Sequence, residues 1–269
     1  MIKRAYIRLV WRNNMAFAIF SVVFITLFQF LLLYLVTTFD TDAILSAILD
    51  QLPPMMRVFL QDSFFSMLTY DGAAAFGFNH PIVLTLLIIT AINIPLHQIT
   101  RETETGTLEL LLAYPFTRRS LIFSLWISGG LILLMIIATA LIGSFMSIFL
   151  FHHLTNEIII SMLQIGFNLW LFMLLIFSMS MLITVFARQG IRAGNLSAVI
   201  TFVFYLLYYI SQIWDLLAFT KPFNIFSYYE PLGLMLNKSS FGQDILVLGI
   251  LVLLCFGVSL RQFEKKDIP

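Results

Sequence analysis

Charged side chains are scarce in this sequence. Only 11% of its 269 residues are Asp, Glu, Lys or Arg, whereas 60% are hydrophobic and 28 are phenylalanine. Water-soluble domains carry roughly a quarter of their residues as charges and about half as apolar residues. The composition therefore excludes an ordinary soluble domain and indicates a protein with several membrane spans.

Cysteine and the common catalytic motifs are also missing. The single cysteine, Cys255, lies in an apolar run, which excludes an intramolecular disulfide. The sequence has no GxxxxGK[ST], so the chain does not itself cradle nucleotide phosphates, and it has no HExxH, CxxC or GxSxG. We therefore expect no catalytic residue, metal site or cofactor on this chain.

What the sequence does have is a series of six apolar runs between charged residues. About 20 apolar residues are needed to cross a bilayer as a helix. These runs show no period-2 alternation, which favours helices over barrel strands. We predict a single all-α membrane domain over residues 1–269, with spans at residues 15–36, 80–99, 120–151, 158–187, 194–214 and 241–260.

The distribution of Lys and Arg predicts the orientation. If six spans alternate, twelve of the fifteen basic residues fall on the side of the two termini. The other side receives only Arg57, Lys221 and Lys238. Because cytoplasmic loops carry the excess of Lys and Arg, both termini are predicted to be cytoplasmic.

Two segments on the predicted outer side are too apolar for plain loops. Residues 37–79 hold two apolar stretches separated by Pro53-Pro54, and residues 216–240 are apolar and aromatic but broken by Pro222 and Pro231. We expect the first to form one or two short helices along the membrane surface and the second to form an interfacial or re-entrant hairpin.

Polar residues inside the spans are few and uncharged. Those that are candidates for lining a transport pathway, or alternatively for hydrogen bonds between helices, are Gln29, Asn93, Gln164 and Asn168. No acidic or basic residue lies at the centre of a predicted span. Ion-coupled transporters usually have one there, so its absence disfavours that class.

The stretch from Arg101 to Arg119, RETETGTLELLLAYPFTRR, separates the second and third spans. Its six charges would cost roughly 15 to 20 kcal/mol at bilayer depth, so it lies at the cytoplasmic surface. Leu108, Leu111 and Leu112 fall on one face at helical spacing, and Pro115 ends the pattern. Thr117 is placed to cap the third span. Lipid-surface helices are usually basic, whereas this one begins with acids, which favours a protein partner over lipid headgroups.

Here the chain resembles a known family. Glu104-Thr105-Gly106-Thr107-Leu108-Glu109-Leu110-Leu111, followed by Pro115 and Arg118, is similar to a signature of the permease subunits of type 2 ATP-binding-cassette exporters, located between the second and third spans. The ending Phe263-Glu264-Lys265-Lys266-Asp267-Ile268 resembles the C-terminus of these permeases. The segments Leu52-Pro53 and Phe226–Pro231 resemble their external elements more weakly.

The resemblance implies a permease in a bacterial inner (plasma) membrane, driven by a separate cytoplasmic ATPase that holds ATP and Mg²⁺. It also implies a second permease copy or a homologous permease, and no nucleic-acid partner. The stretch from Arg101 to Arg119 would be the coupling segment. The residues that would contact the ATPase are Arg101, Glu102, Glu104, Gly106, Thr107, Leu108, Glu109, Leu111, Leu112, Pro115 and Arg118.

Three other functions remain as alternatives. An ion-coupled carrier or channel would act without an ATPase, and a membrane-embedded enzyme would need convergent His, Asp, Glu or Ser side chains, of which the sequence shows no set. A non-transporting membrane anchor for a cytoplasmic partner would use the same surface segment. The transported substrate does not follow from the sequence.

Overall fold

The structure, a computed structural model, describes residues 4–38, 69–101, 117–151, 155–187 and 190–265. Within these ranges every regular element is a helix, and six helical segments are long and apolar enough to cross a membrane. They are α1 (Arg4–Thr38), α5 (Tyr70–Asn79) continued by α6 (Pro81–Leu96) and η1 (His97–Arg101), α9 (Arg118–Phe151), α10 (Asn156–Phe186), α11 (Gly190–Ile213) and α13 (Phe241–Lys265). The prediction of six helical spans is confirmed.

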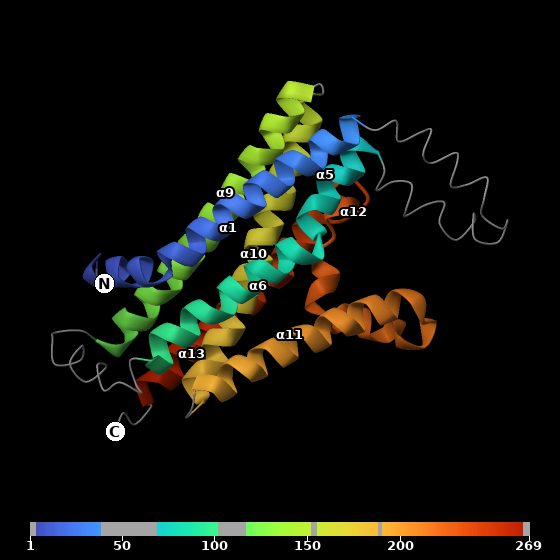
Figure 1. Cartoon of the computed structure of the whole chain (residues 1–269). Helices are drawn as coiled ribbons and strands as arrows, with labels where there is room; N and C mark the ends of the chain where they lie inside the picture. Colours follow the sequence, from blue (N-terminus) through green and yellow to red (C-terminus); the bar gives the residue numbers. More distant parts are fainter. Residues whose placement is uncertain (1–3, 39–68, 102–116, 152–154, 188–189, 266–269) are drawn as a thin grey trace.

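The starts of α1 and α9 lie at the same end of the bundle as the ends of α10 and α13 (Figure 1). We call this the termini end. The helices then run towards the opposite end, where α1 finishes and α5 begins. This arrangement agrees with an even number of crossings, and it groups Arg4, Arg8, Arg118, Arg119 and Lys265 at one end.

Helix α10 is the centre of the bundle. In its most apolar window 72% of the residues are buried, against 22% in α1 and 17% in α11. Helix α10 packs against α6, α9 and α13. An apolar helix that exposes most of its surface is stable only where lipid or another protein covers it. Helices α1 and α11 are the least covered of the six and lie at the periphery; α13, with 28% of its window buried, is only slightly better covered.

Two tryptophans join α9 to α10. The Trp126 indole N–H donates to the Ser178 hydroxyl at 3.0 Å, and the Trp170 indole N–H donates to the Gly130 carbonyl at 2.9 Å. Next to these bonds, a side chain at Gly129 would collide with the Phe177 ring. Gly129 and Gly130 of α9 thus leave room for Phe177 and Trp170 of α10, as expected where helices pack in a membrane.

Helices α1 and α9 are in close contact at Gly143. A Cβ added to this glycine would lie 2.5 Å from the Thr26 backbone oxygen. Ser147, one turn further along α9, is fully buried. The sequence Gly143-x-x-x-Ser147 therefore lies in a tight contact between two helix backbones.

The second span begins earlier than the sequence suggested. Residues Tyr70–Asn79, which we had assigned to the outer surface segment 37–79, form α5 and continue into α6. Thr69 caps α5 by accepting from the Gly72 N–H, and Asp71 lies in its first turn, where a carboxylate is stabilised by the helix dipole. The surface-helix prediction is therefore wrong for these ten residues, while residues 39–68 lie outside the described part.

Pro81 interrupts the helix between α5 and α6. His80 caps α6, its ring nitrogen accepting from the Ile82 N–H at 3.3 Å. The Phe78 carbonyl instead accepts a hydrogen bond from the Tyr229 hydroxyl at 3.0 Å. A helix break in an apolar bundle is thus satisfied by a neighbouring segment, as the absence of water requires.

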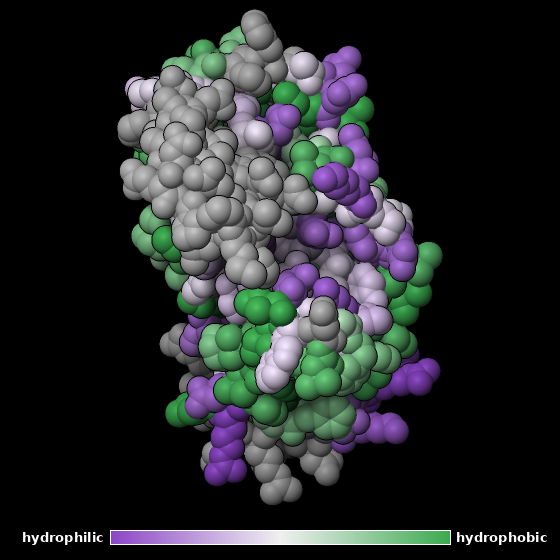
Figure 2. Space-filling view, turned by 90° about the vertical axis from the view of Figure 1, so that its right-hand side faces the viewer, coloured by the Kyte–Doolittle hydropathy of each residue, from purple (hydrophilic) through white to green (hydrophobic). Residues whose placement is uncertain are grey.

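The predicted hairpin at residues 216–240 is made of η2 (Asp215–Phe223), η3 (Ile225–Tyr228) and α12 (Pro231–Met235). Leu216, Phe219 and Phe223 of the first helix are strongly exposed. Figure 2 shows that hydrophobic side chains gather on the lower half of this face of the molecule. After Asn224 the chain returns to the bundle, where Phe226 and Tyr229 pack on Phe172 of α10. Helix η2 therefore lies at the periphery, whereas η3 and α12 pack in the core of the bundle.

Candidate coupling and transport surfaces

Most of the predicted coupling segment lies outside the described residues. This applies to Glu102, Glu104, Gly106, Thr107, Leu108, Glu109, Leu111, Leu112 and Pro115. The structure does describe the chain on both sides of it. The segment leaves η1 at Arg101 and enters α9 at Arg118, at the termini end of the bundle.

On the entry side, α6 changes into a π-helical turn. The His97 N–H is shared between the Asn93 and Ile94 carbonyls, two residues away from Pro95 inside α6. Gln98 and Ile99 are buried, and η1 contacts both α10 and α11. The Gln98 side-chain oxygen has no hydrogen-bond partner among the described residues. A displacement of the coupling segment at Arg101 would therefore act directly on the packing of three spans.

On the exit side, the first turn of α9 is attached to the last turns of α13. The Thr117 hydroxyl accepts from the Ser120 N–H at 3.3 Å, which confirms its predicted role as a cap. Arg119 forms a bidentate ion pair with Glu264, with one N–O distance of 2.9 Å. Arg118 donates to the Glu264 backbone carbonyl at 3.2 Å. Two parallel bonds fix the guanidinium relative to the carboxylate.

Sequence reasoning did not identify Glu264 as a partner of Arg119. Both residues belong to the two segments that carry the resemblance, but they are 145 positions apart and nothing local links them. Phe263, beside Glu264, is buried against the bundle at 2% exposure, so the pair stands on a fixed helix end. The exit of the coupling segment and the C-terminal segment thus form one contact.

The four polar candidates for a transport pathway lie at different interfaces. Gln29 is fully buried on α1 and faces Gly77 of α5. Asn168 is fully buried on α10 and donates to the Tyr228 carbonyl at 3.1 Å. Asn93 lines a cavity between α1 and α6, and Gln164 is half-buried on α10. The structure of one chain does not gather them into a single polar path.

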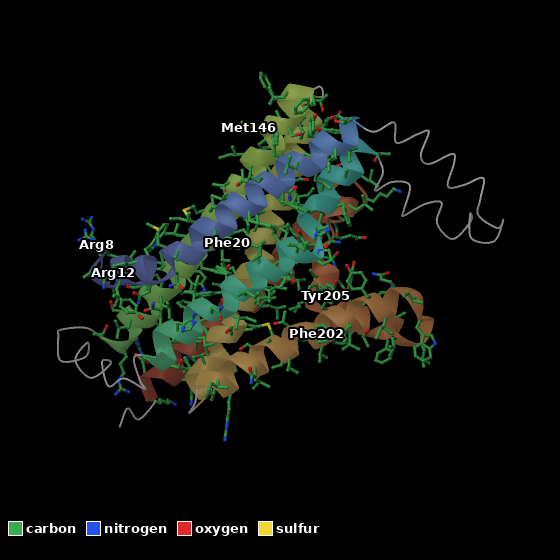
Figure 3. The ribbon with its side chains drawn as sticks, in the orientation of Figure 1. Arg8, Arg12, Phe20, Met146, Phe202 and Tyr205 are labelled. Carbon is green, nitrogen blue, oxygen red and sulfur yellow. The ribbon has the colours of Figure 1, made fainter. Side chains whose placement is uncertain are left out.

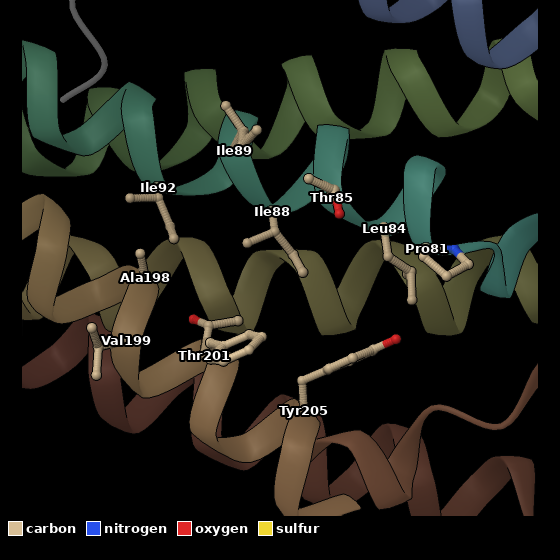
Figure 4. A pocket seen from close by; sticks show the side chains of 11 residues that line it. Pro81, Leu84, Thr85, Ile88, Ile89, Ile92, Ala198, Val199, Thr201 and Tyr205 are labelled. Atoms are coloured by element: carbon tan, nitrogen blue, oxygen red, sulfur yellow. The ribbon is translucent and has the colours of Figure 1, made fainter. Parts of the chain in front are cut away.

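A different surface, formed mainly by α6 and α11, is hollow. A groove with a volume of about 530 Å³ runs between the two helices (Figure 4). Its walls are aliphatic apart from Thr85, Thr201, Phe202 and Tyr205. The Tyr205 ring reaches from α11 towards Leu84 (Figure 4). The groove arises because α11 diverges from the bundle towards η2 (Figure 1). No local sequence pattern marks it, since both helices are apolar all round.

A family model described as ABC-2 family transporter protein matches residues 7–268 of this chain. The chain belongs to the ABC-2 transporter family. No curated protein matches it at a significant level. This ABC-2 permease is therefore a multi-pass membrane protein and a transport subunit of an ATP-binding-cassette transporter. The family implies association with an ATP-binding-cassette ATPase and with the membrane.

Proposed function

We propose that this permease is the membrane subunit of an exporter, energised by a separate ATPase that binds the segment from Arg101 to Arg119 on the cytoplasmic side. The observation that carries the proposal is the placement of the two ends of this segment. One end enters η1, which packs on α10 and α11, and the other enters the turn of α9 that is paired with Glu264. A force on the segment therefore acts on α10 and α11 through η1, and on α9 and α13 through the contact with Glu264.

In this mechanism, ATP-driven closure of the ATPase subunits pushes the leucine face formed by Leu108, Leu111 and Leu112. The exit side resists, because Arg119 and Arg118 hold the first turn of α9 against α13. The entry side yields through η1, whose π-helical turn departs from regular helix geometry. Movement of η1 and α6 relative to α11 changes the width of the groove between these helices.

The groove is also the surface for which we propose a second permease copy. Helix α11 leaves most of its apolar surface uncovered in one chain, including Val199 and Phe202 at the groove. A second copy, or a homologous permease, placed against this side would enclose the groove between two subunits. The enclosed space would be mainly apolar, which suits an apolar or amphipathic substrate. In the proposed orientation the termini end faces the cytoplasm of a bacterial cell, in agreement with its excess of arginine.

The test is ATPase stimulation in a reconstituted complex. We expect the double change Glu104→Ala and Leu111→Ser to leave membrane insertion intact but to abolish stimulation and transport. Leu110→Ser is the matched control, because Leu110 falls on the opposite side of the predicted helix from Leu108 and Leu111. If stimulation and transport survive the double change, the coupling assignment is wrong. Transport without any ATPase would instead support an ion-coupled carrier, and ATPase binding without transport would support an anchor.

A further inference from the structure

A second groove, lined by α1 and α6, is polar at one end and apolar at the other. The polar part is a cavity of about 220 Å³ near the termini end, lined by Asn13, Asn14, Phe17, Thr90, Asn93, Ile94 and His97. The apolar part is a cavity of about 330 Å³ further along the same two helices, lined by Phe20, Phe24, Pro81, Ile82, Thr85 and Leu86. The order of the lining residues shows that α1 and α6 run antiparallel past both cavities.

The two cavities lie one after the other along α1 and α6. Phe17 of the polar cavity contacts Phe20 of the apolar one, with ring centroids 6.3 Å apart. From Asn13 to Phe24 the groove is about 17 Å long at the rise of an α-helix. Its far end is closed by Phe28, which stacks on Phe24 and contacts His80. One leaflet of the hydrocarbon core is about 15 Å thick, half of the roughly 30 Å bilayer core. The groove therefore has the length of one lipid leaflet.

The polar end offers side-chain groups that make no hydrogen bond to the described residues. The Asn14 amide bonds the Val10 carbonyl and the Thr90 hydroxyl bonds the Leu86 carbonyl, so both are occupied. The side chains of Asn13, Asn93 and His97 make no such bond to the described residues. They supply donors and acceptors at the mouth of an otherwise apolar groove.

Two arginines place the polar cavity at the level of the lipid headgroups and make its surroundings positively charged. Arg8 and Arg12 occupy the turns of α1 that precede Asn13, and both extend from the termini end in Figure 3, with Phe20 further along the helix. Neither arginine forms an ion pair within the described ranges. Arginines at a span end place their guanidinium groups at headgroup level, and cationic surfaces at this level attract anionic lipids.

We propose that the groove between α1 and α6 binds one anionic phospholipid from the leaflet at the termini end. Its phosphate-bearing headgroup lies at Asn13, Asn93 and His97, and an acyl chain lies along Phe20, Ile82 and Leu86. Arg8 and Arg12 lie at the same membrane level on the neighbouring faces of α1 and supply positive charge at a distance. This groove and the groove between α6 and α11 lie on two sides of α6 and share only Pro81 and Thr85. Binding of the lipid requires no ATPase.

Native mass spectrometry of the full-length chain in mild detergent tests the proposal, with palmitoyl-oleoyl phosphatidylglycerol as the probe and the phosphatidylcholine of the same chains as comparison. We expect one tightly retained phosphatidylglycerol. Ile82→Trp, which fills the apolar part, and Asn93→Leu, which removes a polar group, should each weaken its retention about tenfold. Leu253→Trp is the matched control, because it places the same bulk at an exposed aliphatic position of α13 that lines neither groove.

The charge component has its own variant. Arg8→Gln with Arg12→Gln should remove the preference for phosphatidylglycerol over phosphatidylcholine while leaving the apolar part intact. Equal retention of both lipids by the unchanged chain would overturn the assignment of an anionic ligand. Lipid retention that falls equally in Ile82→Trp and Leu253→Trp, or in neither, would overturn the site. A change in the number of chains per particle caused by Ile82→Trp alone would show that a second copy covers this groove, and would also overturn the proposal.

Discussion

Replacement of Gly143 by alanine should destabilise the bundle, although alanine is the better helix former. The added Cβ would lie 2.5 Å from the Thr26 backbone oxygen and 3.0 Å from its methyl carbon. Because real contacts of this kind are not shorter than about 3.0 Å, α1 and α9 must separate by at least about half an ångström. Overpacking of this kind costs about 1 to 3 kcal/mol. The collision involves a backbone oxygen, which cannot be relieved by a change of side-chain rotamer.

The matched control is Gly249→Ala in α13, where an added Cβ meets no atom within 4 Å. Both changes carry the same gain in helix propensity, about 1 kcal/mol, so the difference between the two variants isolates the contact at Thr26. Thermal unfolding in detergent should give Gly143→Ala a Tm lower than that of Gly249→Ala, by about 2 to 4 °C for each kcal/mol. An equal rise of Tm in both variants would refute the close approach of α1 and α9.

Three further outcomes follow from contacts of the described residues. Tyr229→Phe should cost about 1 to 3 kcal/mol, measured as a lower Tm, because the buried Phe78 carbonyl loses its donor. Burial raises the pKa of Tyr229 well above its ordinary value, so this loss should be the same at pH 6 and pH 9; a loss confined to one pH would contradict the assigned bond. Arg119→Glu should reduce ATPase stimulation, and Arg119→Glu with Glu264→Arg should restore it; lack of rescue would separate the ion pair from coupling. Trp126→Phe should lower the Tm by about as much as Ser178→Ala, with no further loss in the double variant, because both remove one hydrogen bond.

The number of spans could be predicted because it depends only on how apolar and charged residues are distributed along the chain. Each apolar run between charges must be helical in lipid, and the six runs correspond to six helical segments. The start of the second span could not be predicted in the same way. The charge of Asp71 suggests that the apolar run begins after it. In the structure Asp71 lies in the first turn of α5, where the helix dipole stabilises its carboxylate, while Ala73, Ala74 and Ala75 bury the same helix in the bundle.

Contacts between residues far apart in the chain could not be predicted from the sequence. The pairing of Arg119 with Glu264 and the bond from Tyr229 to Phe78 join residues more than 140 positions apart, and no local pattern encodes them. Both grooves are also properties of how helices diverge, since α6 is apolar all round and shows no preferred face. The role of Glu104, Leu108 and Leu111 remains a prediction, because they lie outside the described residues.

The central claim is that the segment from Arg101 to Arg119 is the surface that meets the ATPase. The direct measurement is site-specific cross-linking in the assembled transporter. Cys255 is the single native cysteine, so Cys255→Ala gives a background in which one new cysteine reports one position. We predict that Leu111→Cys cross-links to the ATPase subunit and that Phe219→Cys, on η2 beyond the far end of α11, does not. A cross-link from Phe219→Cys, or none from Leu111→Cys while the complex remains assembled, would contradict the account.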